Sequence, residues 1–157
     1  MFAGRYDHAL DEKGRTMMPK RFRDRLVALG DKSVWVTLAI DGTQHLDVLP
    51  DSAFNAYFER MSKLPDDKTV LAYRRAYFGS AVEVEVDSVG RILVPAALRA
   101  RCGLGDKIAF VGVDPSKFEL WSPAAYDAQF ADVVENSDAI LAHLAHLEHA
   151  ATLGGQR

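Results

Sequence analysis

Two short stretches of this 157-residue chain carry the same pattern and decide its fold. The first is Asp11-Glu12-Lys13-Gly14-Arg15-Thr16-Met17-Met18-Pro19, and the second is Asp87-Ser88-Val89-Gly90-Arg91-Ile92-Leu93-Val94-Pro95. Both contain Asp-x-x-Gly-Arg, three mostly apolar residues and a proline, at a constant offset of 76 residues (87 − 11 = 76). Four identities in register over nine positions indicate an internal duplication.

The duplication extends beyond these nine residues. At the same offset Phe2 aligns with Phe78 and Arg23 with Arg99, and further on the segment 46–49 aligns with 118–121 at an offset of 72 (118 − 46 = 72). Each copy is about 45–50 residues long, and units of that size seldom bury enough surface to be stable alone. We therefore expect the two copies to pack on each other or on other chains.

Each copy begins with a pattern that predicts a β-hairpin followed by a helix. Residues 6–10 alternate as in a half-buried strand, residues 11–14 have turn composition, and residues 15–18 form the expected return strand. Pro19 has a preset φ that suits the first turn of a helix over residues 20–29. In the second copy the corresponding expectations are strands at 81–86 and 91–94 and a helix that opens at Pro95.

The rest of the chain predicts further strands and connecting helices. Strands are expected at 34–40, 45–49, 108–113 and 118–121. A helix capped by Asp51 or Ser52 ends before the break at residues 65–67, and a second connecting helix runs to about residue 78. A C-terminal helix starts at Ser122-Pro123 and carries an apolar stripe from Phe130 to Leu147, and the residues from Thr152 onward are expected to fray.

Bulk composition is that of an ordinary globular chain, with 26% charged residues and a net charge of −3. The charge is unevenly distributed, because residues 1–25 hold seven Lys and Arg against four Asp and Glu, whereas residues 126–150 hold five acidic residues and no Lys or Arg. A local positive field can attract a polyanion despite an acidic total, although a solvated charged surface explains the same pattern.

Several classes of protein are disfavoured by the sequence. No apolar run reaches the length of a membrane span, and the N-terminus lacks the apolar stretch of a secretory signal. The lone Cys102 permits no disulfide within the chain and is expected in the core. These features predict a cytoplasmic protein that needs no membrane.

An enzyme or metalloprotein is a first alternative. His143, His146 and His149 recur every three residues on a predicted helix and could offer ligands to Zn²⁺ or Ni²⁺. That spacing drifts around the helix, so surface histidines are the simpler interpretation. No phosphate loop, nucleophile elbow or carboxylate pair is present. We therefore expect no catalytic residue, no metal and no cofactor.

The paired motifs resemble the DNA-binding domain of the SpoVT/AbrB superfamily, and their tandem arrangement over residues 1–130 resembles the MraZ family of bacterial transcriptional regulators. The resemblance implies an α+β fold of two tandem swapped-hairpin, β-barrel-type units in a pseudo-twofold arrangement. It places the first domain at 5–52, connecting helices at 53–80, the second domain at 81–124, and a C-terminal helix with a frayed tail at 125–157.

The resemblance also implies a function. Proteins of this kind are cytoplasmic or nucleoid-associated, form ring-like homo-oligomers and bind short direct repeats in double-stranded DNA. Those repeats lie upstream of the division and cell-wall gene cluster, including the regulator's own promoter, and binding usually represses it. No small-molecule substrate is expected. A second alternative is an antitoxin-like interaction module that grips another protein through its C-terminal helix.

The basic turns are the candidate DNA-binding site. A β-ribbon can enter the major groove, where the planar guanidinium of Arg15 would read guanine and Lys13 would contact phosphate. Asp11 and Asp87 are expected to hold the turn amides and the arginines, and Gly14 and Gly90 to supply positive φ angles. The full set of expected DNA-binding residues is Arg5, Lys13, Arg15, Lys20, Arg21, Arg23 and Arg91. A simple ion pair between Arg15 and Asp11 is the competing interpretation.

Overall fold

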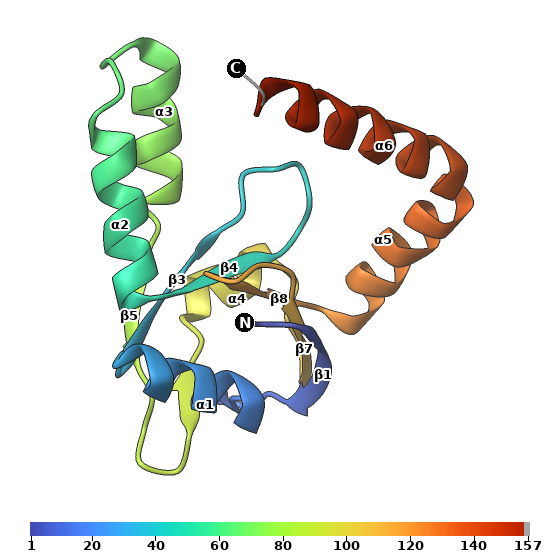
Figure 1. Cartoon of the computed structure of the whole chain (residues 1–157). Helices are drawn as coiled ribbons and strands as arrows, with labels where there is room; N and C mark the ends of the chain where they lie inside the picture. The colour runs from blue at the N-terminus through green and yellow to red at the C-terminus, as the bar shows by residue number, and fades with distance from the viewer. Residues whose placement is uncertain (156–157) are drawn as a thin grey trace. The chain divides into compact units, whose positions relative to one another are not determined.

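The structure is a computed structural model, and it describes residues 1–155. The chain divides into two compact units, Met1–Pro123 and Ala124–Arg157, which are described separately below. Figure 1 shows the chain coloured from the N-terminus to the C-terminus.

The first unit contains both repeats, each with four strands and one helix. The first repeat consists of β1 (Gly4–Ala9), β2 (Arg15–Met17), α1 (Lys20–Leu29), β3 (Ser33–Leu38) and β4 (Leu46–Pro50). The second consists of β5 (Val82–Glu85), β6 (Arg91–Leu93), α4 (Ala96–Arg101), β7 (Lys107–Gly112) and β8 (Phe118–Trp121). The helices α2 (Asp51–Ser62) and α3 (Lys68–Tyr77) connect the repeats as a helical hairpin.

The strands of the two repeats are interleaved. A six-stranded antiparallel sheet has the order β1-β7-β8-β4-β3-β5, and β2 pairs with β6 in a separate two-stranded ribbon. The first strand of each repeat therefore pairs with the third strand of the other. The chain is thus an α+β protein with antiparallel sheets. The predicted local hairpins are wrong: β1 and β2 share one isolated bridge, Leu10 to Thr16, and then diverge to different partners.

The arrangement has an approximate twofold symmetry. When each strand is replaced by its equivalent in the other repeat, the order β1-β7-β8-β4-β3-β5 becomes β5-β3-β4-β8-β7-β1. This is the same order read from the opposite edge of the sheet. Equivalent residues pair with each other at two places: Asp47 lies opposite Glu119 in the sheet, and Thr16 lies opposite Ile92 in the ribbon. Both pairs obey the repeat offsets found in the sequence (119 − 47 = 72 and 92 − 16 = 76), so the pseudo-twofold axis passes through both.

Strand alternation gives the sheet two apolar faces. Leu46 and Val48 of β4 belong to the main core, which also contains Phe22 of α1, Ile92 of the ribbon and Leu98 of α4. The opposite face packs against the helical hairpin through a second cluster built on Leu49, Phe54 and Tyr77. Cys102 is buried in the main core, as predicted.

The helix ends differ in detail from the predictions. Neither Asp51 nor Ser52 caps α2. Pro50 occupies the N-cap, and the carboxylate of Asp31 accepts hydrogen bonds from the backbone N and the hydroxyl of Ser52. The break at residues 65–67 is confirmed, and Asp67 caps α3 by accepting from the amide of Val70 at 2.8 Å.

The second unit consists of two helices in place of the single predicted one. They are α5 (Pro123–Glu135) and α6 (Ser137–Gly154), separated at Asn136. The prediction that the chain frays from Thr152 onward is wrong for residues 152–154, which are helical. Residues 156 and 157 lie outside the described part of the chain. Within residues 1–155, no helix combines the length and apolar character that crossing a membrane requires.

Candidate nucleic-acid interface

The first Asp-x-x-Gly-Arg turn is held by one carboxylate. Asp11 Oδ1 accepts hydrogen bonds from the backbone N of Lys13 at 3.0 Å and of Arg15 at 2.9 Å. Its Oδ2 accepts from Arg15 Nε at 2.8 Å. Gly14 completes the turn with a φ of 86°, where an L-residue with a side chain would be strained. The aspartate therefore fixes both the turn and the arginine that follows it.

The second turn repeats this geometry. Asp87 Oδ1 accepts from the backbone N of Val89 at 3.1 Å and of Arg91 at 2.8 Å, and Oδ2 accepts from Arg91 Nε at 2.8 Å. Gly90 has a φ of 92°. The four turn residues expected to have structural roles, Asp11, Gly14, Asp87 and Gly90, lie where the motif puts them.

Both aspartates are stabilised in their ionised form. Hydrogen bonds from the backbone and guanidinium of Arg15 lower the pKa of Asp11 below its ordinary value, and Arg91 lowers the pKa of Asp87 in the same way. Each arginine uses its Nε for this contact, and within residues 1–155 its two Nη groups form no hydrogen bond. The planar fork remains available to an acceptor outside the chain.

The ribbon formed by β2 and β6 joins the two turns and presents a common outer face. Thr16 and Ile92 point into the core, so their neighbours Arg15, Met17, Arg91 and Leu93 point outward. The two arginine side chains are 39% and 38% exposed, and Met17 and Leu93 are 39% and 50% exposed. Arg15 pairs with Leu93 and Met17 with Arg91, which separates the arginines by about 7 Å along the strands.

Met17 and Leu93 are not among the residues that the motif predicts for this face. The signal that could have found them is the alternation of strand residues, since both lie two positions after a motif arginine. They give the outer face an apolar component between its cations.

Each turn packs against the helix of the other repeat. A side chain at Gly90 would lie 2.6 Å from Arg23 Cδ of α1, and one at Gly14 would lie 2.6 Å from Arg99 Nε of α4. Arg23 Nε donates to the Met18 carbonyl at 3.1 Å, and Arg99 Nε donates to the Val94 carbonyl at 3.0 Å. These equivalent arginines cover the turn glycines, so Arg23 has a packing role that the sequence did not reveal.

Because each turn packs against the helix of the other repeat, the other predicted cations lie at different ends of the ribbon. Lys13 lies in the first turn, next to the start of α4, where the residues are Ala96 and Ala97. Lys20 and Arg21 begin α1, which lies beside the second turn. Both are exposed, and Lys20 Nζ contacts Asp24 at 2.7 Å. Each end of the ribbon thus carries exposed positive charge.

Arg5 lies away from these turns. It sits on β1, six residues before Asp11, which corresponds to about 20 Å of extended strand. Its guanidinium pairs with both oxygens of Asp7, from Nε at 2.8 Å and Nη2 at 2.9 Å. The structure does not bring Arg5 to the ribbon face.

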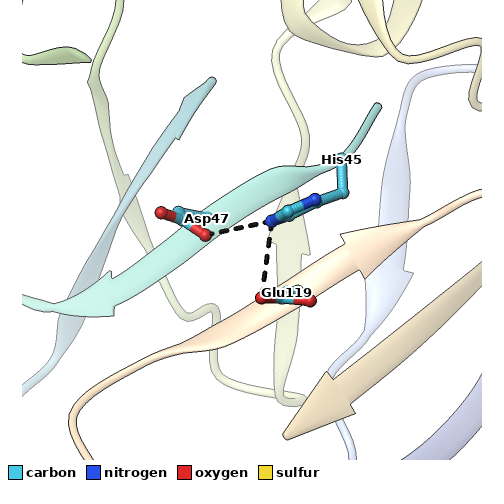
Figure 2. A group of neighbouring side chains, drawn as sticks. All are labelled: His45, Asp47 and Glu119. Carbon is cyan, nitrogen blue, oxygen red and sulfur yellow. Dashed lines mark hydrogen bonds and ion pairs between the residues drawn. The ribbon is translucent and has the colours of Figure 1, made fainter. Parts of the chain in front are cut away.

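A buried ionic cluster lies on the pseudo-twofold axis of the sheet (Figure 2). His45 Nε2 is 3.3 Å from Asp47 Oδ1 and 3.4 Å from Glu119 Oε1. Burial alone lowers the pKa of His45, but hydrogen bonds with the two carboxylates outweigh this effect and raise it to about 9. At neutral pH the imidazole is therefore a cation between two anions.

These three residues are the one group within residues 1–155 with the spacing of metal ligands. Asp47 is already satisfied, because Lys117 Nζ lies 3.0 Å from Oδ1 and the Tyr77 hydroxyl donates to Oδ2 at 2.8 Å. Two cations, His45 and Lys117, thus balance two carboxylates. We assign the cluster to an internal ionic network that joins β4, β8 and α3. His143, His146 and His149 are exposed along α6 and belong to no such group in the described chain.

Comparison with known proteins places the chain in a class built from two tandem repeats. A family model described as MraZ protein, antitoxin-like, matches residues 1–71 and 77–146, one segment for each repeat. The chain belongs to the MraZ family.

Curated relatives agree with this assignment over most of their length. The transcriptional regulator MraZ of Lachnoclostridium phytofermentans is 39% identical over 144 residues, covering 92% of this chain and 95% of the relative. That of Thermomicrobium roseum is 38% identical over 148 residues, covering 94% and 99%. That of Pediococcus pentosaceus is 36% identical over 145 residues, covering 92% and 96%.

Proposed function

We propose that this protein is a DNA-binding transcriptional regulator that is not an enzyme and that grips double-stranded DNA through the β2–β6 ribbon and its two turns. The observation that carries the proposal is the outer face of the ribbon, where Arg15 and Arg91 are related by the pseudo-twofold axis and held by matching aspartates. The names of the relatives as transcriptional regulators support it.

The chemistry of this face suits the major groove. The groove admits a two-stranded ribbon, and an arginine fork matches the O6 and N7 acceptors of guanine. The separation of about 7 Å between the arginines along the strands is about the rise of two base pairs. Lys13 at one end and Lys20 and Arg21 at the other would contact phosphates, with Met17 and Leu93 against the base edges. Arg23 supports a turn, and Arg5 is a peripheral member of the set.

The finer assignments rest on the family resemblance. We propose that the interleaved repeats at 5–52 and 81–124 are swapped-hairpin domains of the SpoVT/AbrB type. The DNA target is a set of short direct repeats upstream of the division and cell-wall gene cluster, including the protein's own promoter, and binding represses transcription. The protein acts at the nucleoid in the cytoplasm and self-associates into a ring, so that several weak contacts add up on repeated sites.

Fluorescence anisotropy tests the DNA-binding proposal. The probe is a labelled duplex from the region upstream of the protein's own gene, beside a scrambled duplex of the same composition, at two salt concentrations. We expect tight binding to the native duplex that weakens steeply with salt, because each neutralised phosphate adds about 0.9 to the log–log slope. Equal and weak binding to both duplexes would contradict the proposal and favour a protein partner.

A further inference from the structure

A cavity of about 360 Å³ lies within the first unit, where the end of α3 meets β5 and α4. This volume is near the lower end of the range for small-molecule sites, about 300–1,000 Å³. Its apolar walls include the side chains of Leu38, Val82 and Leu98, and its charged members are Arg75 and Arg101. None of the described residues that line it is Asp or Glu. The cavity is therefore apolar on its walls and positive in charge.

The two arginines of the cavity have no partner inside the protein. Arg74, the neighbour of Arg75 on α3, donates to the Met61 carbonyl at 3.1 Å and pairs with Asp66. Arg75 and Arg101 are exposed, and within residues 1–155 their guanidinium groups form no ion pair and no hydrogen bond. Two cations that share a cavity without a carboxylate favour an anion there, and the planar fork of arginine matches the oxygens of phosphate.

The equivalent place in the first repeat is occupied by an aromatic ring. Val82 corresponds to Tyr6 and Leu98 to Phe22 (82 − 6 = 76 and 98 − 22 = 76). The Tyr6 ring packs edge-on against Phe22, with ring centroids 5.4 Å apart, whereas Val82 is 41% exposed. The smaller valine thus leaves open beside α4 the space that the tyrosine fills beside α1.

The cavity and the first DNA-binding turn lie on different faces of α4. Arg99 points to the turn, where it covers Gly14. Ala97 and Arg101 line the cavity, and each is two residues from Arg99, so they point about 160° away from it around the helix. DNA held by the ribbon lies on the turn side of α4. A phosphate group that enters the cavity therefore belongs to a small molecule, and the apolar walls favour one with an apolar group attached.

We propose that this cavity binds a small organic phosphate, with Arg75 and Arg101 on the phosphate and the apolar walls around the rest of the molecule. The inference goes beyond the proposed function and does not depend on DNA binding by the ribbon. A ligand in this site would contact α4, the helix that covers the first turn through Arg99.

Isothermal titration calorimetry on the full chain tests the proposal, with phenyl phosphate as the probe. We expect saturable binding that is about 10-fold tighter than that of inorganic phosphate, because the ring is buried against the apolar walls. Arg75→Gln and Arg101→Gln should each weaken binding of phenyl phosphate by about 10-fold, because each removes a charge-assisted hydrogen bond. Circular dichroism should be unchanged, since both positions are exposed.

Filling the cavity separates its shape from its charge. Val82→Tyr places a ring where Tyr6 has one in the first repeat and should abolish binding of phenyl phosphate without any change of charge. The fold should be retained, because tyrosine is favoured in strands and Val82 is exposed. Arg60→Gln, which removes an exposed arginine outside this cavity, is the matched control and should leave the affinity unchanged.

The outcomes distinguish this inference from the proposed function. The absence of saturable binding, or binding that survives Val82→Tyr or both arginine substitutions, would overturn the proposal. Affinity no tighter than that of inorganic phosphate would overturn the assignment of an organic ligand. Weaker binding of the native duplex by Arg75→Gln and Arg101→Gln, without binding of phenyl phosphate by the unaltered protein, would assign these arginines to DNA instead. Equal and weak binding of both duplexes, with phenyl phosphate binding intact, would overturn the DNA-binding proposal alone.

Discussion

The two ends of the β2–β6 ribbon share a backbone and differ in their side chains. At the first end the turn contributes Glu12 and Lys13, and the neighbouring α4 begins with two alanines. At the second end the turn contributes Ser88 and Val89, and the neighbouring α1 begins with Lys20 and Arg21. The positive charge missing from the second turn is thus supplied by the first repeat. The turn skeleton is encoded locally, whereas the charge of each end is shared between the repeats.

The largest expected difference between the ends concerns their glycines. A methyl group on Gly14 would meet the Val94 carbonyl oxygen at 2.8 Å, whereas the three atoms nearest to one on Gly90 all belong to the flexible side chain of Arg23. Both substitutions also incur the strain of a positive φ. We expect Gly14→Ala to lower the free energy of unfolding by about 2–3 kcal/mol and Gly90→Ala by about 1–2 kcal/mol. Urea denaturation measures both, and equal losses would show that the backbone contact at Gly14 relaxes without cost.

We expect the two ends of the ribbon to contribute equally to DNA affinity through Arg15 and Arg91. Arg15→Ala and Arg91→Ala should each weaken binding to the native duplex by about 10- to 100-fold, which is about 1–3 kcal/mol, because each removes one bidentate base contact. The melting temperature should change little, since both ion pairs are exposed. Anisotropy measures the affinities. Unchanged affinity for either variant would exclude that arginine from the interface. A much larger loss of affinity at one end would show that the two ends of the ribbon contribute unequally to binding.

The flanking cations should have smaller and matching effects. Lys13→Ala at the first end and Arg21→Ala at the second should each reduce the log–log salt slope by about 0.9, because each removes one phosphate contact. Ala97→Arg places a cation on α4 at the position equivalent to Arg21 (97 − 21 = 76) and should raise the slope by a similar amount. A change at the first end only would mean that α1 does not reach the DNA.

The smallest expected effect is the response of the turns to acid. The folded pKa of Asp11 and of Asp87 lies below the ordinary value of 3.8, because the following arginine donates to the ionised carboxylate. Their contribution to stability is therefore fully present above about pH 4 and is lost as the pH falls through the folded pKa. NMR titration of the Lys13 and Val89 amides should show both turns changing together below about pH 4. Asp11→Asn should abolish the change at Lys13 alone, and separate midpoints would show that the turns are not equivalent.

The sequence predicts those parts of the fold that depend on neighbouring residues. The Asp-x-x-Gly-Arg turns, the helices after Pro19 and Pro95 and the break at residues 65–67 all have local causes, namely side chain to backbone bonds, positive φ and missing amide donors. The partners of the strands do not. Alternation identified β1 and β2 as strands, yet nothing within residues 6–18 says that one pairs with β7 and the other with β6.

The same division applies to the site. Asp11, Arg15, Asp87 and Arg91 lie in the arrangement that the motif predicts. The packing of Arg23 over the second turn depends on strand exchange and could not be foreseen from the sequence. The cluster of His45, Asp47 and Glu119 was missed because Glu119 is 72 residues from Asp47 (119 − 47 = 72) and meets it only across the symmetry axis.

The exchange of strands between repeats also bears on the ancestry of the chain. A polypeptide carrying one repeat would lack partners for its first and second strands, and another copy of itself is the surface that supplies both. The minimal folded form of this architecture is then an obligate homodimer. Two interleaved repeats that share one sheet and are joined by a helical hairpin are the arrangement that fusion of such a dimer would produce, with residues 53–80 linking its halves.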